Sequence, residues 1–184
     1  MDVFEAMADR RSVRKFTSAQ VDQADLDRIL EAGRMSASWA NTQCWEIVLV
    51  RDSKMKEKLA DTLSEHNPAR KAVVQAPVVI VACGKKGKSG CKKGEHTTVL
   101  GDWLMFDVAL FLSNVTHAAH ALRYGTVHVG LFDQDEVARL LSVPDDVQVV
   151  EIVPLGRPQD PSKNAPPRKD IREFCREENF QGSS

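Results

Sequence analysis

The chain has 184 residues, 42% of them hydrophobic and 28% charged, with a formal net charge of −1, which suits one soluble domain spanning residues 1–184. The near-zero charge provides no overall attraction to nucleic acid or anionic lipid, and no apolar run approaches the roughly 20 residues that span a bilayer. With no signal peptide in view and no C-x-x-C among the four cysteines, we expect a cytoplasmic protein without a disulfide framework, a structural metal, or contacts to nucleic acid or membrane.

The first half of the chain alternates helical and extended patterns. A short amphipathic turn at residues 3–7 precedes apolar spacing that predicts a helix over residues 23–34, with Asp22 as its N-cap. A strand is expected at 46–50, and Ser53 is expected to cap a helix that runs to about residue 64.

A second β-branched run predicts a strand at 77–82. Four glycines and five lysines then predict a mobile surface loop at 84–95. Residues 99–122 form the longest predicted helix, and its apolar side chains cover nearly the whole circumference. Such a helix must be buried on every side, so in a small domain we expect a partner chain to cover part of it.

The last part of the chain is mixed. Gly125 is expected to precede a short strand at 126–129, and a helix at 134–141 and a strand at 148–155 follow. Four prolines within ten residues exclude a helix or a central strand after Gly156. We therefore predict an extended C-terminal arm over 156–184 that carries a short helix at 170–177.

Basic residues gather near the start of the chain, in the segment Arg10-Arg-Ser-Val-Arg14. Guanidinium groups match phosphate oxygens in geometry, and the hydroxyl of Ser12 adds another donor, so the cluster suits a doubly charged phosphate. The alternative interpretation is a solvated, charged helix end.

A second polar segment, Ala37-Ser-Trp-Ala-Asn-Thr-Gln-Cys-Trp45, lies between a predicted helix and a predicted strand. Amides and hydroxyls at such a junction suit a planar heterocycle with donors and acceptors on its edge. An Asn/Ser turn anchored by Trp45 in the core is the alternative.

Together, these two segments resemble the nitroreductase family of FMN-dependent flavoenzymes, whose pattern reads R-[RH]-S-x-[RK] and then P-S-x-x-N-x-Q-P-W. The later segments 99–122, 127–133 and 165–169 are similar to the family's long helix, glycine turn and basic arm, in the same order. Ala37 and Cys44 replace both family prolines. The short chain is similar to the compact branch of the family, which lacks the inserted helices that cover the flavin.

The resemblance implies an α+β fold, a mostly antiparallel sheet flanked by helices, that dimerises through the helix at 99–122 with two FMN sites at the interface. It implies these cofactor-binding residues: Arg10, Arg11, Ser12, Arg14, Ala37, Ser38, Trp39, Asn41, Asn67, Gly130, Leu131 and Arg168. The basic cluster and Arg168 would hold the phosphate and ribityl chain. Residues 37–41 would reach the flavin from the other subunit, and the backbone at 130–131 would approach flavin N5.

The activity implied by this resemblance is ping-pong reduction of nitroaromatic or quinone-like acceptors by NAD(P)H, with hydride passing through flavin N5 and with no catalytic side chain or metal. A flavin-binding redox-sensing module, or another flavin chemistry on the same fold, is the main alternative. A P-loop at residues 82–89 is disfavoured because no helix begins after Ser89. Cys83, Cys91 and His96 have irregular spacing for a metal site.

Overall fold

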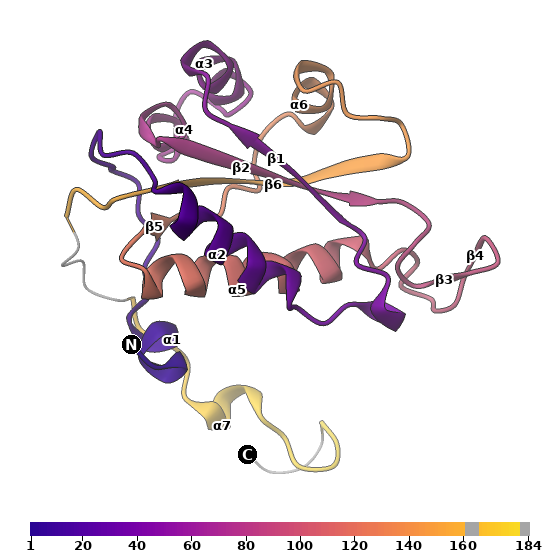
Figure 1. The fold of residues 1–184 in the computed structure, drawn as a ribbon. Coiled ribbons are helices and arrows are strands. Elements are labelled where there is room, and N and C mark those ends of the chain that lie inside the picture. Colours follow the sequence, from indigo (N-terminus) through magenta and orange to yellow (C-terminus); the bar gives the residue numbers. More distant parts are fainter. Residues whose placement is uncertain (161–165, 181–184) are drawn as a thin grey trace.

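The computed structural model describes residues 1–160 and 166–180. It has a central antiparallel sheet with helices on both faces (Figure 1). The elements are α1 (Val3–Asp9), α2 (Gln23–Arg34), the 3-10 turn η1 (Trp39–Asn41), β1 (Trp45–Val50), α3 (Ser53–Asp61), α4 (Arg70–Gln75), β2 (Val78–Lys85), β3 (Cys91–Lys92), β4 (Glu95–His96), α5 (Leu104–Ala121), β5 (Gly125–Thr126), α6 (Gln134–Leu140), β6 (Val147–Gly156) and α7 (Ile171–Phe174). The main sheet has the order β1-β2-β6-β5, and all its pairs are antiparallel. The predicted α+β class is confirmed.

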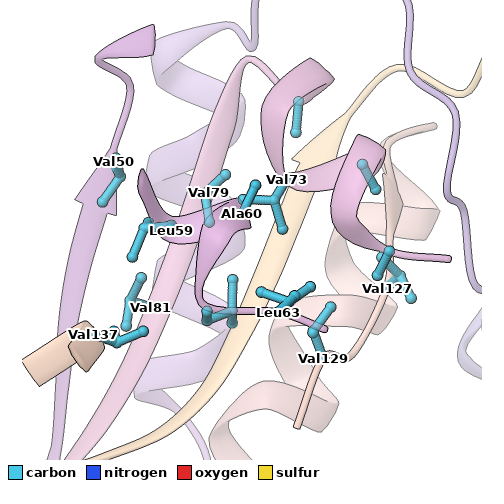
Figure 2. Packing of buried hydrophobic residues seen from close by; sticks show 14 of the residues in the cluster. Val50, Leu59, Ala60, Leu63, Val73, Val79, Val81, Val127, Val129 and Val137 are labelled. Carbon is cyan, nitrogen blue, oxygen red and sulfur yellow. The ribbon is translucent and has the colours of Figure 1, made fainter. Parts of the chain in front are cut away.

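Strand β2 lies in the middle of the sheet and is buried on both faces, which explains its uninterrupted apolar sequence. Val79 and Val81 face α3, α4 and α6, where Leu59 and Val73 pack against them (Figure 2). Ile80 on the opposite face belongs to a second apolar cluster formed with α2 and α5. The strand extends to Lys85, three residues beyond its predicted end, and a bulge interrupts its register with β6 after Ala82.

The long helix α5 lies against α2, and the two approach closely at Gly33. A Cβ atom on Gly33 would lie 2.6 Å from Cε2 of Phe111, so only glycine fits this crossing. The helix begins at Leu104, five residues later than predicted. Within one chain it is not buried all round, because Met105 and Phe106 are 59% and 53% exposed.

Several element boundaries differ from the predictions. Asp22 does cap α2, but α3 is capped by Asp52, whose carboxylate accepts the Met55 N–H at 2.8 Å, and not by Ser53. Helix α3 ends at Asp61, and α4 was not predicted at all. The predicted strand at 126–129 pairs only at β5, followed by an isolated bridge from Val129 to Ile152.

The segment 84–95 is not a loop throughout. After β2, strands β3 and β4 form a small hairpin, and Ser89 and Gly90 are buried. A Cβ atom on Gly90 would lie 2.5 Å from Cδ1 of Trp103, so the indole packs directly on this backbone. The mobility of the segment stays a prediction.

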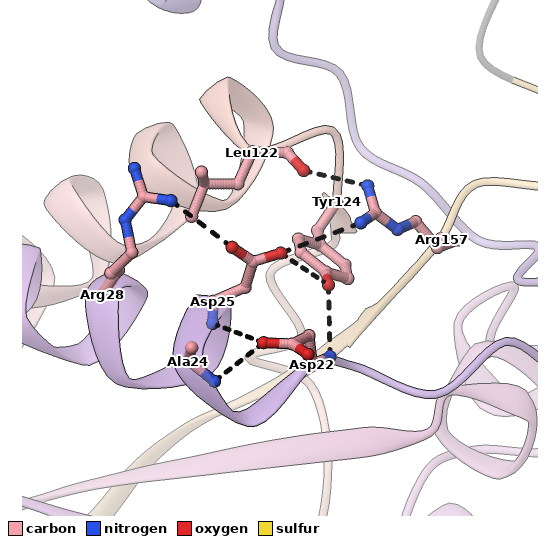
Figure 3. Close-up of polar contacts among 7 residues, drawn as sticks. All are labelled: Asp22, Ala24, Asp25, Arg28, Leu122, Tyr124 and Arg157. Carbon is pink, nitrogen blue, oxygen red and sulfur yellow. Dashed lines mark hydrogen bonds and ion pairs between the residues drawn. The ribbon is translucent and has the colours of Figure 1, made fainter.

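The C-terminal arm leaves the sheet at a polar anchor (Figure 3). Arg157 donates to the Leu122 carbonyl at 2.9 Å, and its guanidinium lies 3.8 Å from the centre of the Tyr124 ring. The Tyr124 hydroxyl donates to Asp25 at 3.0 Å and accepts the Asp22 N–H at 3.2 Å. This anchor directs the arm toward the N-terminal segment.

Beyond the anchor, Gln159 N–H donates to the Lys15 carbonyl at 3.0 Å, so the arm runs beside the basic segment. Helix α7 covers only Ile171–Phe174 of the predicted 170–177, with Asp170 in a capping box. The parts of the predicted arm at 161–165 and 181–184 lie outside the described residues.

Candidate functional site

The basic segment begins where α1 ends. A capping box between Asp2 and Glu5 starts this helix, and Arg10 at its C-cap turns the backbone into an extended conformation. Val13 N–H then donates to the Thr126 carbonyl at 2.8 Å, and Ser12 forms a parallel bridge with Thr126. The segment is thereby fixed between a helix end and the edge of the sheet.

Three arginines, Arg10, Arg11 and Arg168, lie near enough here for their charges to act on one another. Burial lowers the pKa of Arg10, and the positive charges of Arg168 and Arg11 lower it further. Nη1 of Arg10 and Nε of Arg11 are buried, and neither has a hydrogen-bond partner among the described residues. Like charges gathered around unpaired donors are costly unless an anion lies among them. The arrangement therefore suits a multiply charged anion such as a phosphate.

Two cavities flank Arg11. One of about 320 Å³ is lined by Arg11, Ser12 and Arg14 together with Gln159 at the start of the arm. The other, about 630 Å³, lies between the basic segment and the C-terminal end of α5, where His120 lines it. Arg14 itself is exposed at the surface.

The polar segment 37–44 folds onto the other end of α5. Trp39 N–H donates to Oδ1 of Asp107 at 3.0 Å, and the Thr42 hydroxyl donates to Oδ2 at 3.3 Å. Asp107 lies in the first turn of α5 and is 0% exposed. Ala37 and Asn41 are exposed, and Ser38 and Trp39 are half-buried.

The two predicted groups of cofactor contacts therefore lie apart within one chain. Asp107 and His120 are 13 positions apart along α5, which corresponds to about 20 Å at 1.5 Å per residue. Figure 1 shows the same separation, with α1 near one end of α5 and the segment before β1 near the other. Arg10, Arg11 and Arg168 come together, whereas Ala37, Ser38, Trp39 and Asn41 do not join them.

The remaining predicted contact residues, Asn67, Gly130 and Leu131, lie together where the chain continues after β5. The Asn67 amide donates to the Leu131 carbonyl at 3.3 Å, and its oxygen accepts the Ala69 N–H at 2.9 Å. Leu131 is 72% exposed, and a Cβ atom on Gly130 would meet nothing within 4 Å. Asn67, Gly130 and Leu131 thus form one open surface, whose backbone a planar ligand could approach.

Sequence reasoning did not single out Asp107, although a lone acidic residue inside an apolar helix is an informative signal. Asp107 also acts on Cys44. Burial raises the pKa of the Cys44 thiol to about 12, and among the nearby charges the Asp107 carboxylate contributes most to that rise.

Among residues 1–160 and 166–180, no three His, Cys, Asp or Glu side chains are grouped to hold a metal ion. Nor does any helix in that part of the chain have the length and hydrophobicity to cross a membrane.

Comparison with known proteins identifies relatives over nearly the whole chain. Residues 7–75 and 66–157 match the model of the Nitroreductase family. A candidate NADH dehydrogenase/NAD(P)H nitroreductase of Methanothermobacter thermautotrophicus is 31% identical over 87% of this chain and 79% of its own. The FMN reductase [NAD(P)H] of Bacillus subtilis is 30% identical, over 90% of this chain and 69% of its own. The crystal structure of a nitroreductase family protein from Clostridium novyi has a TM-score of 0.78 and 26% identity, covering 100% of this chain and 97% of that one.

Proposed function

Because the chain belongs to the nitroreductase family, we propose that it is an FMN-dependent oxidoreductase that uses NAD(P)H to reduce nitroaromatic or quinone-like acceptors. The names of its relatives, an FMN reductase and NAD(P)H nitroreductases among them, support the donor and the cofactor. An enzyme activity dependent on NAD(P)H is the common element of those names.

The observation that carries the proposal is the pair of buried donors without partners, Nη1 of Arg10 and Nε of Arg11, in the positive field to which Arg168 contributes. The terminal phosphate of FMN is a dianion, and its oxygens can accept from several guanidinium groups at once. The donor set therefore fits this cofactor. Ser12 and Arg14 line the adjacent cavity and are expected to extend the same site along the ribityl chain.

The cofactor site is proposed to be shared between two copies of the chain. In one copy, residues 37–41 and the basic cluster lie at opposite ends of α5, about 20 Å apart along its axis. Exposed apolar side chains on α5, Met105 and Phe106 among them, offer a surface that a second copy would bury. A homodimer through α5 accounts for both features.

The chemistry that FMN supplies when bound is two-electron transfer from NAD(P)H to an acceptor, with donor and acceptor using one site in turn. The chain's own part is to bind and orient. Asn67 holds the backbone at Leu131, and the open space at Gly130 would leave room for the ring of a bound flavin. No side chain is assigned as catalytic.

The visible spectrum of the purified protein tests the cofactor, and turnover tests the activity. We expect flavin absorption bands and release of FMN on denaturation, with NAD(P)H oxidation in the presence of a quinone. A protein that fails to bind added FMN would contradict the proposal. Binding of FMN without turnover would favour the redox-sensing alternative.

A further inference from the structure

The segment 37–44 has a strained backbone. Ala40, Asn41 and Gln43 have φ of 46°, 56° and 48°, in the left-handed region that costs a residue with a side chain about 1 kcal/mol or more. Neither Ala37 nor Cys44 restricts the chain as a proline would. Hydrogen bonds within the segment, such as Asn41 N–H to the Ser38 carbonyl at 3.1 Å, offset part of this strain, and contacts with the rest of the protein add to them.

Asp107 provides those contacts from inside the fold. Its carboxylate accepts the Trp39 N–H and the Thr42 hydroxyl, the two residues on either side of the strained pair Ala40 and Asn41. The Cys44 thiol, 3.7 Å from Oδ2, approaches the same carboxylate. Because the carboxylate is completely buried, water cannot replace these partners at little cost.

The outer side of the segment is left free by this arrangement. Ser38 Oγ accepts the Gln43 N–H at 3.0 Å, and Asn41 Oδ1 accepts from the Gln43 amide at 3.2 Å, so these groups order the loop from outside. Ala37 and Asn41 are exposed. The buried carboxylate thus supports Trp39 and Thr42 from inside, while hydrogen bonds within the segment order its outer side.

We propose that Asp107 is a positioning residue of the cofactor site, which holds residues 38–44 in the shape that meets the FMN bound by the partner subunit. This role rests on the proposed function. Asp107 does not touch the cofactor. It acts through the backbone N–H of Trp39 and the hydroxyl of Thr42.

Asp107→Ala removes all three acceptor contacts, whereas Asp107→Asn keeps the size of the side chain and one acceptor oxygen for Trp39. Thr116→Ala is the matched control, because Thr116 is another polar residue of α5, 1% exposed, whose hydroxyl donates to the Ser113 carbonyl within the same helix. It lies nine positions beyond Asp107, about 13 Å along the helix axis. Its loss should lower thermal stability without reaching the loop.

Two measurements test the effect of Asp107 on the loop and on FMN binding separately. Hydrogen exchange of the FMN-free protein, followed by mass spectrometry, reports the protection of residues 36–44. We expect exchange there to be about tenfold faster in Asp107→Ala and unchanged in Thr116→Ala. Titration of FMN, followed by flavin fluorescence, should give a Kd about tenfold higher in Asp107→Ala, which corresponds to about 1.4 kcal/mol. The Kd of Asp107→Asn should rise less than about threefold, and light scattering should find every variant dimeric.

The outcomes separate this inference from the proposed function. Unchanged exchange at 36–44, an unchanged Kd in Asp107→Ala, or an equal loss in Thr116→Ala would overturn the role of Asp107 alone. Loss of FMN that only follows dissociation of the dimer would also overturn it. A wild-type chain that binds no FMN would overturn the proposed function and, with it, the cofactor part of this role.

Discussion

Replacing Arg168 separates the binding of the phosphate from the stability of the fold. This side chain is exposed, and in the protein alone its charge disfavours the charged form of Arg10. Arg168→Ala therefore relieves a repulsion when no anion is bound and removes a partner when the FMN phosphate is bound. The two effects have opposite signs.

The magnitudes follow from these surroundings. A hydrogen bond to a charged group contributes about 1.5–3 kcal/mol, and the exposure of Arg168 places it at the lower end, so FMN should bind about tenfold more weakly. The free energy of unfolding of the FMN-free protein should change by less than about 0.5 kcal/mol, since Arg168 is exposed and solvent screens its repulsion of Arg10.

Titration with FMN and with riboflavin measures the first effect, and urea unfolding measures the second. Riboflavin lacks the phosphate, so its Kd should be the same in wild type and variant. Arg176→Ala is the matched control, because Arg176 is an exposed arginine of the same C-terminal segment, whose guanidinium donates to the Arg172 carbonyl at 3.0 Å.

An unchanged Kd for FMN in Arg168→Ala would refute the convergence of guanidinium groups on the phosphate. An equal weakening in Arg176→Ala would do the same, since it would point to a general charge effect. A riboflavin Kd that rises in parallel would place Arg168 near the ring instead of the phosphate.

Three further outcomes are expected. Gly33→Ala should lower the free energy of unfolding by about 1–3 kcal/mol, because the new methyl group would overlap Phe111 and this outweighs the preference of alanine for helices. Urea titration measures this change, and a more stable variant would contradict the close crossing of α2 and α5. At pH 8 the native protein should be alkylated slowly at Cys44 and Cys83, since burial raises the pKa of these thiols to about 12 and about 11. Peptide mapping measures the labelling, and labelling of both thiols before the protein unfolds would contradict their burial. Burial also lowers the pKa of His120, so the unfolded state takes up the proton first as pH falls below about 6.5, and stability should decline there. His120→Gln should make this decline shallower in urea midpoints between pH 8 and 5, and an identical slope contradicts the assignment.

The candidate site could be proposed from the sequence in part because two of its basic residues are adjacent in the chain. Arg10 and Arg11 are neighbours, and their meeting with an arginine of the arm follows from the resemblance. The contacts of Asp107 could not be foreseen because its donors, Trp39 and Thr42, lie 65 or more positions away. Nothing in the local pattern indicates which loop folds back to satisfy a buried carboxylate.

The amino-acid pattern alone determined the elements whose burial follows a simple period. The apolar run of β2 could be predicted because helices cover both faces of that strand, so every position is buried. The Asp22 cap of α2 could be predicted because the N–H groups that its carboxylate accepts belong to the next residues in the chain. Tertiary structure decided the rest. Ser89 is buried in a loop that contacts Trp103, whose backbone N–H donates to the Ser89 carbonyl at 3.1 Å, and α5 starts at Leu104 although Val99 and Leu100 before it are apolar and exposed. Hydrophobic character favours burial, but only packing against distant segments decides which apolar side chains obtain it.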